Sequence, residues 1–171
     1  MRRLFLLHGL ARPVTDGQPD SPVPTAVPPP RECVERDNTG SVAGSEVSGA
    51  VVWHREDLRI RDHPAVTAAT TDADVVLPLF VFDPGFYGDS GLACDARIRF
   101  LHECLFDLDD RYNTASAGHA GLTYAYGDPI PVLEAFGNAG WTIFASRTPT
   151  GRYGLERDRA AADLGVRFVS G

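Results

Sequence analysis

The sequence contains no lysine, because all 16 of the basic residues in its 171 positions are arginine. This absence excludes Schiff-base lysine chemistry and the lysine of a phosphate-binding P-loop. Acidic residues outnumber basic ones by 23 to 16, and the formal net charge of −7 argues against a nucleic-acid-binding surface. No GxGxxG, GxxxxGK[ST] or GxSxG segment occurs, so the signatures of dinucleotide, P-loop and serine-hydrolase sites are all missing.

Cysteines and long apolar runs are also scarce. Cys33, Cys94 and Cys104 form no CxxC pair, and neither they nor the five histidines show the spacing of a metal site. An odd number of thiols without a pairing pattern is typical of a reducing compartment. No run approaches the roughly 20 apolar residues of a membrane-spanning helix. The N-terminal apolar run is also too short for a signal peptide. We therefore expect a soluble, cytoplasmic protein without a bound metal ion.

Residues 1–48 differ in composition from the rest of the chain. Seven of the 13 prolines lie here, and the proline-rich stretch at 22–30 is followed by the polar stretch DNTGSVAGSEVSG. Such a composition buries too little apolar surface to offset the conformational entropy of an ordered chain. We predict a disordered segment over 1–48, followed by one folded domain over 49–171.

In the second part, strand and helix patterns alternate. The order β-α-β-α-β-α-β-α-β predicts a three-layer, Rossmann-like α/β domain with helices on both faces of a five-stranded parallel sheet. Counted along the chain, its strands are expected in the order 3-2-1-4-5. Asp62 and Asp128 are expected to cap helices that begin at proline, and Gly165 to end one. The predicted strands are 50–54, 74–83, 122–129, 141–146 and 166–170, and the main helices are 96–112, 129–139 and 155–165.

Six charges follow the first strand, in the segment VVWHREDLRIRDHPAV at 51–66. This connection lies at the carboxyl edge of the sheet, where α/β domains bind their ligands. We expect Asp57 and Arg59 to pair within the loop while Arg55 faces a cleft. A purely structural role is the alternative, because helix caps and ion pairs at sheet ends are common.

The segment WHREDLRIRDHPAV resembles the opening signature of the DNA photolyase/cryptochrome family. The resemblance continues, in order and spacing, through LPLFVFDP, ARIRFLHECLFDLDDRY, YGDP and RYGLERDRA, and covers about residues 50–171. It implies the N-terminal α/β domain, which in this family holds a light-harvesting antenna chromophore for light-driven DNA repair. Two positions depart from the signature, which has a second basic residue where Glu56 stands and asparagine where His63 stands.

The resemblance also implies a set of cofactor-binding residues. Positions that contact a deazaflavin antenna in the deazaflavin-binding subgroup are matched here by Arg55, Phe80, Asp83, Arg97 and Asp128. An aromatic ring supplies a stacking wall for a flat tricyclic ligand, and polar groups bind its edge. For Phe80 an ordinary core position is an equal alternative. A folate antenna is less expected, because Tyr153 and Gly154 stand where folate-binding members have an Asn-Glu pair.

Relatives bind FAD and damaged DNA through a helical C-terminal domain that has no counterpart in this sequence. We therefore expect a truncated photolyase or cryptochrome that is not catalytic alone, does not bind DNA directly, and could act with a separately encoded FAD domain. One alternative is a stand-alone nucleotide-binding α/β module, whose phosphate loop would be SRTPTGRYG at 146–154. The other is a non-functional gene fragment.

Overall fold

A computed structural model describes residues 3–4, 27–35, 47–87, 93–118, 121–147 and 152–171. Five of its strands form the predicted parallel sheet, in the order β4-β3-β2-β5-β6. This is the order 3-2-1-4-5 expected from the sequence, so the fold prediction is confirmed. The strands are β2 (Gly49–His54), β3 (Val75–Phe82), β4 (Thr123–Tyr126), β5 (Trp141–Ser146) and β6 (Arg167–Val169).

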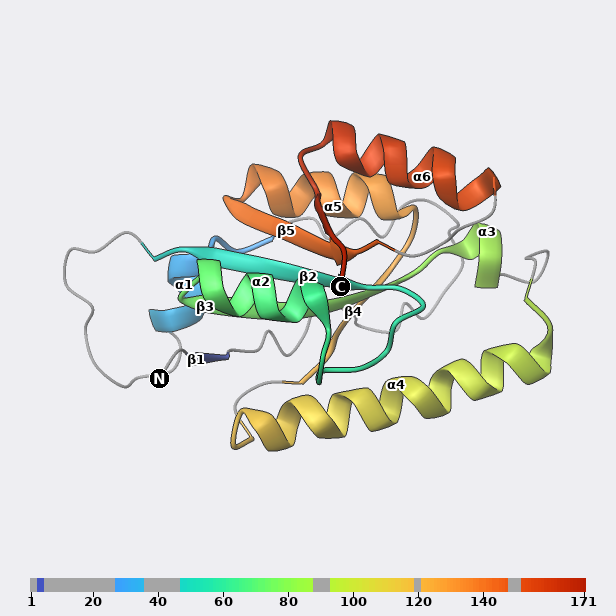
Figure 1. Cartoon of the computed structure of the whole chain (residues 1–171), viewed down its shortest axis with the longest axis horizontal. Helices are drawn as coiled ribbons and strands as arrows, with labels where there is room; N and C mark the ends of the chain where they lie inside the picture. The colour runs from blue at the N-terminus through green and yellow to red at the C-terminus, as the bar shows by residue number, and fades with distance from the viewer. Residues whose placement is uncertain (1–2, 5–26, 36–46, 88–92, 119–120, 148–151) are drawn as a thin grey trace, which may run out of the picture.

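Helices cover both faces of the sheet (Figure 1). One face packs against α2 (Pro64–Asp72) and α4 (Asp95–Ala115), and the other against α5 (Pro129–Asn138) and α6 (Arg152–Asp163). Successive side chains of β2 alternate between these layers, since Val52 packs with α2 residues while Val51 and Trp53 lie in the α5 and α6 core. A central strand that is buried on both faces therefore ends at the carboxyl edge with His54.

Part of the segment predicted to be disordered is ordered. A two-residue strand, β1 (Arg3–Leu4), pairs with β3, and a short helix, α1 (Pro30–Glu35), packs at the start of β2. Cys33 of α1 is only 6% exposed, and the Trp141 indole Nε1–H donates to the Pro28 carbonyl at 2.9 Å. These contacts bury apolar surface that the composition alone does not reveal, so the disorder prediction is wrong for α1. Most of residues 1–48 lies outside the described ranges.

Two of the three predicted helix ends, those at Asp128 and Gly165, are confirmed. Asp128 caps α5 by accepting from the Ile130 amide at 3.0 Å, and Gly165 follows α6 with a positive φ of 89°. At α2, however, the cap is His63, whose Nδ1 accepts from the Val66 amide at 3.2 Å. Asp62 has instead a left-handed φ of 53°, which turns the chain one residue before the His63 cap. The Asp62 cap prediction is therefore wrong.

One further helix, α3 (Pro84–Tyr87), was not predicted, because a single turn has no periodicity. Asp83 begins it by accepting from the Gly85 amide at 2.8 Å. None of the helices in the described ranges is both long enough and apolar enough to cross a membrane.

Candidate functional site

The charged loop after β2 is anchored to the sheet and to α6 by its first residue, Arg55. Arg55 points toward α6, where its guanidinium donates to Asp158 Oδ1 and to the Ser146 carbonyl, each at 2.5 Å. Its carbon Cζ lies 5.1 Å from the ring centre of Trp53 and 5.3 Å from that of Phe168. The Arg55 side chain is only 5% exposed, so it links β2, β5 and α6 rather than lying open at the edge.

Within the loop, the predicted pairing of Asp57 with Arg59 is confirmed. Arg59 Nε lies 3.4 Å from Asp57 Oδ1, and Arg59 also donates to the Asp62 carbonyl at 3.0 Å. These bonds use the charges to fix the shape of a loop that has no regular secondary structure. The abrupt change from buried strand to dense charge thus has a structural explanation.

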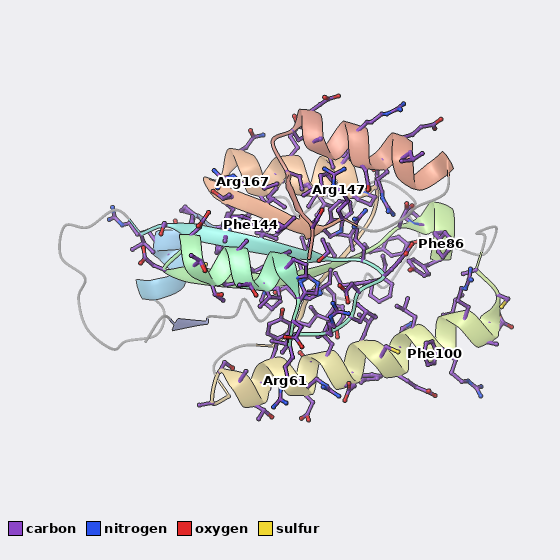
Figure 2. The ribbon with its side chains drawn as sticks, in the orientation of Figure 1. Arg61, Phe86, Phe100, Phe144, Arg147 and Arg167 are labelled. Carbon is purple, nitrogen blue, oxygen red and sulfur yellow. The ribbon has the colours of Figure 1, made fainter. Side chains whose placement is uncertain are left out.

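Aromatic side chains gather at the carboxyl end of β3. The ring of Phe82 stacks between His102 of α4 at 5.6 Å and Tyr124 of β4 at 6.0 Å, with interplanar angles of 26° and 25°. Tyr87 of α3 meets Phe82 edge-on at 5.9 Å and Phe86 at 4.9 Å. We call these five side chains, Phe82, Phe86, Tyr87, His102 and Tyr124, the aromatic rim. Figure 2 labels Phe86 on α3 and Phe100 on α4, the two helices that border it.

Phe80 lies beneath this aromatic rim. It is 2% exposed and packs with Leu105, Leu108 and Tyr112 of α4, while its ring centre is 4.9 Å from that of Phe82. Phe80 is therefore a core residue, as the structural alternative had it. Since every side chain of the aromatic rim is at least partly exposed, these rings rather than Phe80 are available to a ligand.

Charged groups from four segments influence the pKa of the Tyr87 hydroxyl. Burial raises the pKa of Tyr87, and the largest electrostatic influence on it is Arg157 of α6, which lowers it. Glu56 and Asp83 raise the same pKa, while Arg97 lowers it. Two arginines and two carboxylates, from the charged loop, the end of β3, α4 and α6, thus act electrostatically on one half-buried phenol. This mixture of charge beside aromatic rings can address both the polar edge and the flat face of a ligand.

The structure brings some of the five predicted residues together and separates others. Phe80, Asp83 and the exposed Arg97 all lie near Tyr87. Arg55 lies on the opposite face of β2, against α6, and Asp128 is exposed at the start of α5. The period-two alternation of strands explains the separation, because residues at neighbouring strand ends can point to opposite layers.

Sequence reasoning missed Phe82, Tyr87 and Tyr124. A signal existed for Phe82, since it lies two residues after Phe80 and must share its face of β3. Tyr87 had none, because α3 is too short to leave a pattern. Tyr124 requires the β3–β4 register, in which it pairs with Phe80.

Other kinds of site receive no support. Among the residues whose positions are described, no group of three or more His, Cys, Asp or Glu side chains could hold a metal ion. The segment proposed for a nucleotide module at 146–154 includes residues 148–151, which lie outside the described ranges.

Comparison with known proteins gives a consistent picture. The family model described as DNA photolyase matches residues 50–168. Cryptochrome-1 of Drosophila melanogaster is 37% identical over 87 residues, which make up 49% of this chain and 16% of that protein. Cryptochrome-1 of Spalax judaei is 31% identical over 125 residues and 70% of this chain. The chain spans only 16% and 21% of these two curated relatives.

Solved structures agree with this. A bacterial class III photolyase from Agrobacterium tumefaciens is 28% identical with a TM-score of 0.60, over 77% of this chain and 28% of that one. An archaeal photolyase from Sulfolobus tokodaii, described with two FAD molecules and a novel light-harvesting cofactor, has a TM-score of 0.63 at 22% identity. That match covers 71% of this chain and 28% of the archaeal protein.

Proposed function

The chain belongs to the DNA photolyase family, and from this premise we propose that its α/β domain binds a flat antenna chromophore at the aromatic rim. The observation that carries the proposal is the position of Tyr87. Its ring packs with Phe82 and Phe86 of the aromatic rim, and its pKa responds to the charges of Arg157, Glu56, Asp83 and Arg97. A tricyclic chromophore needs both features, a stacking surface and polar partners for its edge.

We propose a deazaflavin-type chromophore rather than a folate. Arg97 and Asp83 match antenna-contacting positions of the deazaflavin-binding subgroup, and both lie near Tyr87. Arg157 adds a second cation beside the same hydroxyl, which suits an electron-rich carbonyl or an anionic ring edge. Arg55 and Asp128 contribute indirectly in this proposal, because each is engaged in holding a helix.

The chemistry that such an antenna serves is a further part of the proposal. In a light-driven DNA repair protein or photoreceptor, the antenna absorbs light and passes the energy to FAD. We propose that FAD and DNA binding belong to a different domain, which acts together with this α/β domain. The supporting observation is that this chain matches only 16% and 21% of the two cryptochromes compared above.

A fluorescence titration tests the site. The ligands are a deazaflavin, a folate and FAD, and the variants are Arg97→Ala and Arg99→Ala. Both arginines are exposed on α4, and Arg97 influences the pKa of Tyr87, so Arg99→Ala is the control for loss of one arginine from the same helix. Loss of a charged hydrogen bond costs about 1.5–3 kcal/mol, so Arg97→Ala should bind the deazaflavin roughly tenfold or more weakly.

Two outcomes would contradict the proposal. Equal affinity of the two variants would show that the arginine near Tyr87 does not contact the ligand. Tighter binding of folate or FAD than of the deazaflavin would overturn the choice of chromophore.

A further inference from the structure

A buried polar cluster lies at the point where β2, α2, α4 and β5 meet. Its members are His54, His63, Tyr112 and Ser146, and each is 6% exposed or less. The rings of His54 and His63 have their centres 4.9 Å apart, and those of His54 and Tyr112 5.6 Å apart. We call these four side chains the histidine cluster. None of them belongs to the aromatic rim or to the charged groups around Tyr87.

The hydrogen bonds of His54 fit its neutral form. Its Nδ1 lies 3.2 Å from the Asp57 carbonyl, which can only accept, so Nδ1 carries the hydrogen. The other nitrogen, Nε2, lies 2.7 Å from the Tyr112 hydroxyl and accepts its hydrogen in the neutral ring. His54 thus joins the charged loop to α4 across the end of β2.

The cap of α2 also requires a neutral His63 ring. Its Nδ1 accepts from the Val66 amide, so this nitrogen must be unprotonated for α2 to be capped. A protonated ring would lose that bond and place a positive charge at the positive end of the helix dipole. Ser146 Oγ of β5 lies 3.3 Å from Nε2 of the same ring.

Among the residues that the structure describes, the charged groups that influence the two rings are Asp57 and Arg59 of the loop. Asp57 Oδ2 lies 3.8 Å from His63 Nε2 and favours protonation, whereas Arg59 opposes it. From α4, β5 and β2 the neighbours are Tyr112, Ser146 and the histidines themselves. Burial is the largest influence on both rings, and it lowers the pKa of His63 and of His54.

The attachment of α4 depends strongly on this cluster. Only Leu105, Leu108 and Tyr112 are buried among the 21 residues of that helix. Tyr112 is therefore both one of the three buried side chains of α4 and the partner of His54. Opening the cluster would remove a large part of what holds α4 to the sheet.

We infer that the histidine cluster is an acid-sensitive switch, in which neutral His54 holds α4 to the sheet and neutral His63 holds the start of α2. In the open state each imidazole reaches water and takes up a proton at its ordinary pKa. Protonation then favours the open state, by about 30-fold per histidine at pH 5 if that pKa is about 6.5. The switch is independent of whether the aromatic rim binds a chromophore.

Hydrogen–deuterium exchange of the full chain between about pH 8 and about pH 5 tests the inference, a range above the ordinary pKa of carboxyl groups. After correction for the intrinsic pH dependence of exchange, protection of α4 and of the first turn of α2 should fall by about 30-fold or more. Protection of α5, which packs in the core on the other face of the sheet, is the internal reference and should change much less. His54→Phe should remove the pH dependence of α4, and His63→Asn, which can still cap a helix, that of α2.

The inference stays testable if one of these variants folds poorly, because the others test it independently. His63→Asn alone tests whether His63 controls the start of α2. Tyr112→Phe should lower the protection of α4 from exchange at every pH while leaving its pH dependence in place. An equal loss of protection in α4 and α5 of the wild type would overturn the inference, since it would indicate global unfolding. An unchanged pH dependence of α4 in His54→Phe, or of α2 in His63→Asn, would also overturn it.

Discussion

The guanidinium of Arg55 is much more enclosed than that of Arg59 in the same loop, with side-chain exposures of 5% and 55%. The sequence predicted that Arg55 lies at the carboxyl edge of the sheet, but not on which face of the sheet its side chain lies. Which face it would take depends on whether the alternation of β2 continues past His54, and the sequence does not show this. Arg55 shares a layer with Trp53, while Phe80 lies in the layer of α4.

Replacing Arg55 by alanine should strongly destabilise the protein. The change leaves the Asp158 carboxylate without its closest cation and opens a space between two aromatic rings. Breaking such an enclosed pair costs about 3 kcal/mol or more in the free energy of unfolding. Arg111→Ala is the matched control, because Arg111 pairs with Asp107 at 2.7 Å but both side chains are more than half exposed. Its expected cost is below about 1 kcal/mol in urea denaturation, and similar costs for both variants would contradict the structure.

His54 should make the stability of the protein depend on pH. Burial, followed by the nearby His63, lowers the pKa of His54 to about 3. Between that value and the ordinary pKa of about 6.5, the unfolded chain binds a proton that the folded chain does not. The free energy of unfolding should therefore fall by about 1.4 kcal/mol for each pH unit below about 6.5. Urea denaturation of the wild type and of His54→Phe should show a flatter profile for the variant, and parallel profiles would argue against a buried neutral histidine.

At the scale of elements, the sequence predicted what periodicity can encode. All five long strands and their order were predictable, because alternating strands and helices permit only right-handed crossovers. The 21-residue α4 was predictable from its apolar stripe. What escaped prediction was short or decided by tertiary contacts: α1, α3, and the choice of His63 over Asp62 as the cap of α2.

The packing of α4 makes a sharp prediction about two of its side chains. Leu108 is fully buried beneath the helix, whereas Phe106 is 71% exposed on its outer side. Leu108→Ala should cost about 2–4 kcal/mol in the free energy of unfolding, because it leaves a cavity against Phe80 and Leu105. Phe106→Ala removes more atoms but should cost less than about 0.5 kcal/mol. Thermal or urea denaturation measures which of the two variants loses more stability. A larger loss of stability in Phe106→Ala than in Leu108→Ala would mean that α4 presents a different face to the sheet.

At the scale of the whole molecule, the domain and the candidate site follow from the sequence to different degrees. The fold and the family could be inferred because both rest on patterns spread over about 120 positions. The aromatic rim could not, because it is assembled from β3, β4, α3 and α4, and its key residue Tyr87 lies in a single turn. The domain start at residue 49 stays a prediction, although α1 packs against the beginning of β2.

Because α1 packs on the domain ahead of residue 49, two shortened chains can test where the folded unit begins. A chain of residues 27–171 keeps α1 and the Pro28 carbonyl that binds Trp141, whereas a chain of residues 48–171 loses both. The second chain also loses Pro30. This proline packs so closely on Gly49 of β2 that there is no room for a Cβ atom at that position. We expect the shorter chain to be less stable by about 1–3 kcal/mol, from a lost hydrogen bond and newly exposed apolar surface. Urea denaturation followed by tryptophan fluorescence measures the difference. Equal stability of the two chains would show that α1 only rests on the domain and that residue 49 is its true start.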